Sequence, residues 1–232
     1  MTDFPHWLDR LAQLSLLLAA ACALLVAIDV ARRPQKMWIM NIVWPLTALF
    51  GSVIWLAAYW RWGRAGGEER RGLPFWVSVG KGASHCGAGC TLGDLIAEWA
   101  AFAMPSIAVW FGWKSLFAEK VFAVWILDFI LAFGLGIVFQ YFTIKPMRDL
   151  SVGEGVRAAV KADIASISAW QVGMYGLMAA IQFGWLKPAY GAIAPVDSAI
   201  FWFAMQIAML AGFATAFPVN WWLIRAGWKE RM

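Results

Sequence analysis

The chain has 232 residues, of which 62% are hydrophobic and only 14% are charged, and its mean hydropathy is +0.65. A soluble domain has about half apolar and about a quarter charged residues, so this composition excludes an ordinary soluble protein. The formal net charge of +5 does not indicate nucleic-acid binding, because the basic residues lie between apolar runs, where they set topology and contact lipid headgroups. We therefore expect the lipid bilayer as a partner and no nucleic acid.

Six apolar stretches are each long enough to cross a bilayer, which takes about 20 residues of α-helix. They are residues 11–30, 38–60, 91–112, 121–143, 163–186 and 197–224, separated by basic or proline-containing segments. The sequence thus predicts an all-α, polytopic membrane bundle of about six helices. We divide it into 1–74, an amino-terminal hairpin with a basic cytoplasmic loop, and 75–232, a four-helix membrane core.

The distribution of Lys and Arg predicts the orientation. With the amino terminus inside, cytoplasmic segments hold 13 of the 19 basic residues, so both termini are predicted to be cytoplasmic. Arg32, Arg33 and Lys36 do not follow the rule, because this orientation places them on the outer side of the membrane. The expected location is the cytoplasmic membrane of a bacterium or archaeon.

The third and fifth stretches resemble each other. Gly93-Asp94-Leu95 lies near the start of the third, and Ala162-Asp163-Ile164 near the start of the fifth. They close with Phe111-Gly112-Trp113 and Phe183-Gly184-Trp185. We expect a duplicated helical hairpin, formed by the third and fourth spans and by the fifth and sixth, as in many transporters.

Four chemically distinctive residues follow one another at i+4 steps: Cys86, Cys90, Asp94 and Glu98. Each step turns about 40° around an α-helix, so the four side chains form a slowly winding stripe on one face. We expect the two cysteines at the entrance of the third span, where a helix amino terminus would favour thiolates. The two carboxylates then lie deeper in the membrane.

The functional interpretation of this stripe is a soft-metal site. His85, Cys86 and Cys90 supply the imidazole and thiolate ligands that suit Cu(I) or Zn(II), and the carboxylates would relay the ion or a proton. The alternative is that the cysteines pack in a glycine-rich helix contact and Asp94 caps the helix. Glu98 favours function, because an ionisable group inside a span costs about 2.5–3.5 kcal/mol on insertion scales.

Two further aspartates stand out. Asp128 lies inside the fourth span and must face the bundle interior or water. It is either a proton or cation site or a hydrogen-bond partner of Gln171 or Gln206. Asp163 begins the predicted fifth span, where we expect a cap or a surface ion pair with Lys161.

Other polar or thioether side chains are candidates for lining a path. Asn220 follows Pro218 closely and would satisfy the backbone carbonyl that the proline frees. Met174 and Met205 each begin an i+4 methionine pair, which suits either Cu(I) or simple packing. The candidate lining residues are Gln140, Asp163, Gln171, Met174, Gln206 and Asn220.

The sequence has no Walker A motif, no dinucleotide fingerprint and no nucleophile elbow, so we expect no nucleotide cofactor. Haem with two histidine ligands is not expected either, because the chain has only His6 and His85. The sequence contains no positive indication of an enzyme and leaves that question open.

Two segments carry a resemblance to a known family. Residues 84–94, Ser-His-Cys-Gly-Ala-Gly-Cys-Thr-Leu-Gly-Asp, and 218–225, Pro-Val-Asn-Trp-Trp-Leu-Ile-Arg, resemble signatures of the prokaryotic membrane family DUF4396, a domain of unknown function. The resemblance covers about residues 75–232 and includes Gln140-Tyr141-Phe142 and Lys161-Ala162-Asp163. It implies a membrane protein without an assigned activity. Some members are joined to small heavy-metal-binding domains, an association that favours a metal.

We therefore predict a membrane protein that binds or transports a soft metal such as Cu(I) through the stripe of Cys86, Cys90, Asp94 and Glu98, with Asp128 on the inner path. A metal ion, a metallochaperone and a second copy of the chain are the further candidate partners.

Two alternatives remain open. The first is a thiol oxidoreductase that uses Cys86 and Cys90, although thiols four residues apart on a regular helix are poorly placed for a disulfide. Unwinding at Gly87 or Gly89 would remove that objection. The second is a structural or assembly protein whose polar residues only fix helix packing.

Overall fold

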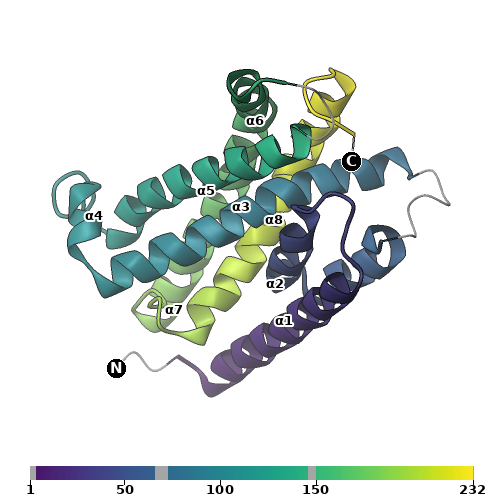
Figure 1. The fold of residues 1–232 in the computed structure, drawn as a ribbon. Coiled ribbons are helices and arrows are strands. Elements are labelled where there is room, and N and C mark those ends of the chain that lie inside the picture. The colour runs from purple at the N-terminus through teal and green to yellow at the C-terminus, as the bar shows by residue number, and fades with distance from the viewer. Residues whose placement is uncertain (1–3, 66–72, 146–149, 232) are drawn as a thin grey trace.

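The structure, a computed structural model, describes residues 4–65, 73–145 and 150–231 and is helical throughout these ranges apart from short connections (Figure 1). The elements are α1 (His6–Arg32), α2 (Met40–Ala58), η1 (Tyr59–Gly63), α3 (Phe75–Ala103), α4 (Ser106–Trp110), α5 (Lys120–Ile144), α6 (Val152–Ala179), η2 (Ala180–Leu186), α7 (Lys187–Tyr190) and α8 (Ala199–Arg225). The π-helical turns η1 and η2 continue α2 and α6. The prediction of an all-α membrane bundle is confirmed.

Within the described ranges, five segments are long and apolar enough to cross a membrane: His6–Arg32, Met40–Gly63, Lys120–Ile144, Val152–Tyr190 and Ala199–Arg225. The 29-residue helix α3 is not among them, yet it runs through the middle of the bundle (Figure 1). Of its 29 residues, 19 are buried. Neighbouring helices therefore shield α3, which is how a helix with many polar side chains is accommodated at membrane depth.

The position of α3 corrects the predicted helix entrance. The helix begins at Phe75 and not near Thr91, so Cys86 and Cys90 lie in its middle. Asp94 is likewise an interior residue and not an amino-terminal cap. The argument that a helix amino terminus favours the thiolates therefore does not apply.

Close packing explains why such a glycine-rich segment is helical. A Cβ atom on Gly89 would lie 2.9 Å from the backbone nitrogen of Gly136, and one on Gly93 would lie 2.7 Å from that of Ala132. Gly89 and Gly93 thus form a small-residue face that meets the corresponding face of α5 at backbone contact. Contacts with a neighbouring helix, which local propensity does not include, stabilise this part of α3.

The second predicted span, 38–60, is folded back on itself. Within α2, Ser52 has φ 47° and ψ −130°, which breaks the helix direction. The two arms pack together, since the rings of Trp44 and Tyr59 are 5.4 Å apart. Tyr59 donates a hydrogen bond of 2.8 Å to Asp29, near the end of α1, where Arg64 also binds. Both ends of the α2–η1 segment therefore lie at the end of the bundle where α1 finishes.

This reversal places the two termini at opposite ends of the bundle (Figure 1). Near the amino terminus, Phe4 packs against Tyr190 with ring centroids 5.7 Å apart. Near the carboxyl terminus, Trp228 packs under the ammonium of Lys161, 4.5 Å from the ring. Tyr190 ends the continuous helix that contains Lys161, so the two contacts lie at opposite ends of it. The membrane side on which each terminus lies stays a prediction.

Helix α6 begins earlier than predicted. Ser151 and Glu154 form a capping box that starts the helix at Val152, so Asp163 lies three turns inside it. The pairing of the remaining long helices agrees with the predicted hairpins, because α3 packs most extensively against α5, and α6 against α8.

Candidate functional site

The most unusual feature of the interior is a lysine ammonium bound between α3 and α6. Nζ of Lys229 lies 2.8 Å from Oδ1 of Asp163, 3.1 Å from Sγ of Cys86 and 3.2 Å from the carbonyl oxygen of Gly82. The side chains of Lys229 and Asp163 are 0% exposed. We call this group, with Ser166, the Lys229 site.

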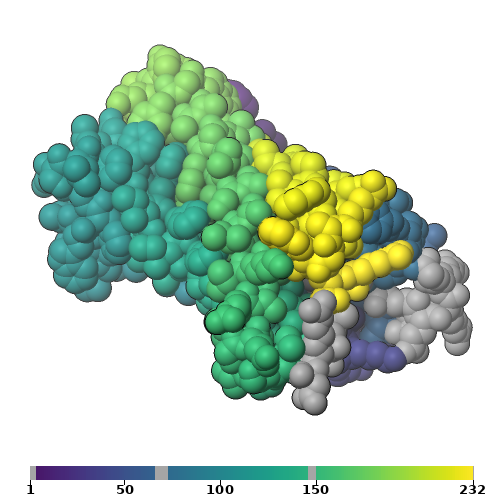
Figure 2. Space-filling view, turned by 90° about the horizontal axis from the view of Figure 1, so that it is seen from above, coloured from purple at the N-terminus to yellow at the C-terminus, as the bar shows by residue number. Residues whose placement is uncertain are grey.

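The end of α8 delivers Lys229 to this position. Gly227 has φ 70°, and the amide of Trp228 donates to the carbonyl of Leu223 at 2.9 Å, while that of Gly227 donates to Ile224 at 3.2 Å. This is the Schellman arrangement, in which glycine adopts the left-handed conformation and reverses the chain. Residues after Gly227 therefore fold back over the helix end, and Figure 2 shows this yellow segment beside the green start of α6.

A second layer of hydrogen bonds holds the thiol. Sγ of Cys86 is 2.9 Å from Oγ of Ser166 and donates to Oδ1 of Asp163 at 3.3 Å. Asn220 donates to Oγ of Ser166 at 2.6 Å and to the carbonyl of Ala216 at 2.9 Å. Asn220 therefore supports the thiol. We predicted that Asn220 would bind the backbone carbonyl that the proline of α8 frees, and this prediction is wrong. The site joins α3, α6 and α8.

Electrostatics keep the ammonium charged. Burial alone would lower the pKa of Lys229, but the carboxylate of Asp163 and the sulfur of Cys86 raise it above its ordinary value. The expected surface pair of Asp163 with Lys161 is wrong, because Asp163 is buried and binds Lys229 instead. Its second oxygen, Oδ2, has no hydrogen-bond partner within the described ranges.

His85 does not join this site. Its Nε2 is 2.8 Å from Oγ1 of Thr143 on α5, whereas Cys86 faces α6. Adjacent residues of a helix point about 100° apart, so the two side chains diverge. The predicted ligand group of His85, Cys86 and Cys90 is therefore not brought together around His85.

A carboxyl pair lies farther along α3. Asp94 on α3 and Asp128 on α5 are buried near each other, and Tyr175 donates to Oδ2 of Asp128 at 3.3 Å. Asp128 does not form the predicted hydrogen bond with Gln171 or Gln206. Ionisable side chains at membrane depth are costly, so the two carboxyl groups are a candidate functional feature of the interior.

The remaining candidates are buried but scattered. Gln206 is bonded to Ser15 and to the carbonyl of Leu49, and Met174 packs in the main hydrophobic core. The side-chain amides of Gln140 and Gln171 have no hydrogen-bond partner in the described part of the chain. Glu98 is buried one turn beyond Asp94. These residues add polarity to the interior without forming one common site.

Among the described residues, no group of three or more His, Cys, Asp or Glu side chains is arranged to hold a metal ion. Cys86 and Cys90 are free thiols on a helix that stays regular through Gly87 and Gly89. The unwinding that would favour a disulfide between them is therefore not seen.

Comparison with known proteins places the chain in a family. Residues 75–229, from the first residue of α3 to Lys229, match the family described as "Domain of unknown function (DUF4396)". The chain belongs to this family. The predicted resemblance is confirmed, and the matched part of this DUF4396 protein contains the whole Lys229 site. No curated protein and no solved structure matches the chain.

Sequence reasoning missed Lys229 and Ser166. Ser166 follows Asp163 by three residues, which places both on one face of α6, and this spacing was an available signal. Lys229 lies 66 residues from Asp163 and beyond the last span, so no local pattern indicates it.

Proposed function

We propose that this DUF4396 protein binds a soft metal cation as its substrate at the sulfur of Cys86, beside Asp163, and that Lys229 occupies the site when the metal is absent. The observation that carries this proposal is the coordination of the buried ammonium. A carboxylate oxygen, a sulfur and a backbone carbonyl surround it, and these are groups that also bind metal cations. The ammonium is in effect a tethered cation in a cation site.

The sulfur of Cys86 favours a soft ion, because thiolate ligands select Cu(I) and Zn(II). Zn(II) requires three or four protein ligands, and the described residues offer no group of three His, Cys, Asp or Glu donors here. We therefore favour Cu(I) as the substrate. His85, which binds Thr143, is not part of the proposed ligand set.

The exchange of lysine for metal preserves the charge of the buried site. Before exchange, the Lys229 ammonium neutralises the Asp163 carboxylate. As the ammonium leaves, the Cys86 thiol transfers its proton along the existing hydrogen bond to Asp163, and the resulting thiolate binds the monovalent metal. The site is neutral in both states, which avoids an uncompensated charge in a low-dielectric interior.

The deeper residues of α3 supply a path for the ion or for protons. Cys86, Cys90, Asp94 and Glu98 follow one another at i+4 steps and are all buried. Twelve residues separate the first from the last, which corresponds to about 18 Å along the helix axis. Asp128 adds a second carboxyl beside Asp94. Intramembrane ionisable residues in such a line are typical of ion and proton pathways.

The charge distribution supports an orientation with the Lys229 site at the cytoplasmic end. The structure describes 16 Lys and Arg residues. At the end of the bundle where the amino terminus lies, there are only four of them: Arg10, Lys114, Lys120 and Lys187. The other 12, including the three that did not fit the sequence-based orientation, lie at the opposite end. The rule that basic residues are in excess inside the cell then predicts a cytoplasmic carboxyl terminus and an external amino terminus. Delivery by a metallochaperone and self-association remain predictions.

Titration of the purified protein with Ag(I), a redox-stable soft monovalent ion, tests the proposal. The wild type and the Cys22→Ser control should bind one ion that the Cys86→Ser variant does not bind with comparable affinity. Cys22 is a suitable control because it is a free, buried cysteine in α1, away from the Lys229 site. Equal stoichiometry and affinity for wild type and Cys86→Ser would overturn the proposal.

A further inference from the structure

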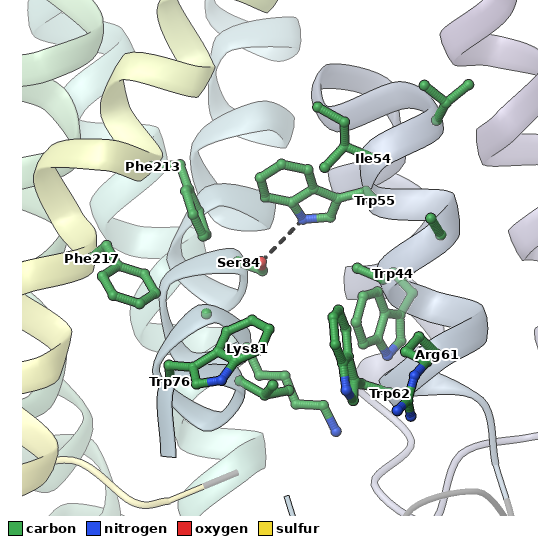
Figure 3. Close-up of a pocket in the computed structure, with 15 residues that line it drawn as sticks. Trp44, Ile54, Trp55, Arg61, Trp62, Trp76, Lys81, Ser84, Phe213 and Phe217 are labelled. Atoms are coloured by element: carbon green, nitrogen blue, oxygen red, sulfur yellow. Dashed lines mark hydrogen bonds between the residues drawn. The ribbon is translucent and has the colours of Figure 1, made fainter. Parts of the chain in front are cut away.

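A large apolar pocket opens on the side of the bundle between α2, α3 and α8 (Figure 3). Its volume is about 720 Å³, within the range of about 300–1,000 Å³ that is typical of small-molecule sites. Val53, Ile54 and Trp76 on its rim are exposed, at 50%, 63% and 48%. In a membrane these exposed apolar side chains face lipid, so the pocket is accessible from the bilayer.

Aromatic side chains form the walls. Trp55 and Phe213 meet edge to face with ring centroids 4.8 Å apart, and Trp55 is held by a hydrogen bond of 3.1 Å from its ring nitrogen to Ser84 (Figure 3). Trp62 and Trp76 meet in the same way at 5.0 Å. The tryptophan rings thus form fixed apolar surfaces, and those near the helix ends are placed where indole rings collect at the membrane–water boundary.

One end of the pocket is basic. Lys81 extends from α3 toward the side where Arg61 and Trp62 lie, below Trp55 in Figure 3. Arg61 lies over the Trp62 ring at 5.6 Å and is exposed, while Lys81 is only 6% exposed. No acidic side chain lines the pocket among the described residues. The pocket is therefore apolar along its length and positively charged at one end.

The pocket is separate from the Lys229 site. Ser84 faces the pocket, and Cys86 faces α6. Two residues apart on an α-helix, side chains point about 200° apart, so the two sites lie on opposite faces of α3. A ligand in the pocket has no need to contact the thiol.

We propose that this pocket binds an anionic phospholipid, with an acyl chain between Trp55 and Phe213 and the phosphate beside Lys81 and Arg61. The charge complementarity selects an anionic headgroup, and the exposed rim gives entry from the bilayer. Lys81 and Arg61 lie at the same end of the bundle as the ten other described basic residues there, where anionic lipids of the cytoplasmic leaflet are attracted. The inference does not depend on the metal proposal.

Native mass spectrometry of the detergent-purified full chain tests the lipid site. Dioleoyl phosphatidylglycerol and dioleoyl phosphatidylcholine, which share their acyl chains, are titrated separately. Wild type should bind one phosphatidylglycerol preferentially, and Arg61→Gln and Lys81→Gln should each lower that preference about fivefold, the effect expected of one basic residue. The control Arg32→Gln, an exposed basic residue at the end of α1, should leave it unchanged.

A second variant tests the acyl-chain part of the pocket. Gly80 faces the Phe213 and Phe217 wall, 3.9 Å from each ring for an added Cβ, so Gly80→Leu fills the space without a backbone clash. Leucine also favours the helix more than glycine does, which protects the fold. This variant should bind both lipids at least about tenfold more weakly than wild type does. Equal binding of both lipids by wild type, or unchanged binding by Gly80→Leu, would overturn the proposal.

Discussion

The ammonium of Lys229 and the carboxylate of Asp163 are 2.8 Å apart, and neither side chain is exposed. Lys229 comes from the carboxyl-terminal segment, and Asp163 lies three turns inside α6. A buried ion pair of this kind contributes little net stability compared with an apolar pair, but breaking it leaves a buried charge alone. The pair is therefore better explained by a role in the site than by stability.

A double-mutant cycle tests the coupling of these two residues. Lys229→Met and Asp163→Asn should each lower the free energy of unfolding by about 3 kcal/mol, because each leaves one partner uncompensated. The double variant should lie within about 1 kcal/mol of wild type. The measurement is reversible unfolding in detergent. Additive losses in the double variant would show that the two side chains are not coupled.

The reversal of the chain at Gly227 is the device that positions Lys229. Gly227→Ala should destabilise the protein by about 1 kcal/mol, because alanine tolerates φ 70° poorly, and should increase alkylation of Cys86 by a membrane-permeant maleimide. Gly191→Ala is the matched control, since Gly191 has φ 77° at the other end of the bundle. Equal alkylation rates in the two variants would contradict this role for Gly227.

Backbone contact between α3 and α5 depends on Gly89. Gly89→Ala should lower the free energy of unfolding by about 1–3 kcal/mol, because the added Cβ would lie 2.9 Å from the backbone nitrogen of Gly136. Gly134→Ala on α5 should have no such effect, since among the described residues nothing beyond its own helical turn lies within 4 Å of the added Cβ. Thermal unfolding of both variants distinguishes the outcomes; a Gly89→Ala protein as stable as wild type would mean that the helices do not pack this closely.

The opposite placement of the termini gives a topology prediction. A green fluorescent protein fused after residue 232 should fluoresce, because it folds in the cytoplasm, and a cysteine introduced near Phe4 should react with an impermeant maleimide from outside intact cells. An introduced cysteine at Lys36 should react only after permeabilisation, since that end is predicted to be inside. Labelling of the amino-terminal cysteine only after permeabilisation would contradict this orientation.

Much of the bundle could be predicted from hydropathy alone, as the long apolar helices α1, α5 and α8 show. The start of α3 could not be predicted in this way, because its glycines and polar residues are typical of a loop. Their close packing against α5 is seen only in the structure. The reversal in α2 was missed because Gly51 and Ser52, where it occurs, lie in a mostly apolar run of spanning length.

The site was predicted in parts. Cys86, Asp163 and Asn220 were each identified as candidates from residue type and position. Their convergence requires contacts across 54 to 77 residues of sequence, which no periodicity contains. His85 was grouped with Cys86 because it is adjacent in sequence, whereas the helix turns it toward Thr143. Adjacency in sequence on a helix is a poor guide to a shared site.

The central claim, that Lys229 occupies a cation site, is tested most directly by removing the tethered ammonium. In equilibrium titrations with Ag(I), Lys229→Met should bind the ion about tenfold or more tightly than wild type, because the competing state is no longer populated. Lys161→Met, which removes an ammonium that lies over the Trp228 ring and outside the site, should bind as wild type does. Unchanged or weaker binding by a folded Lys229→Met protein would contradict the account.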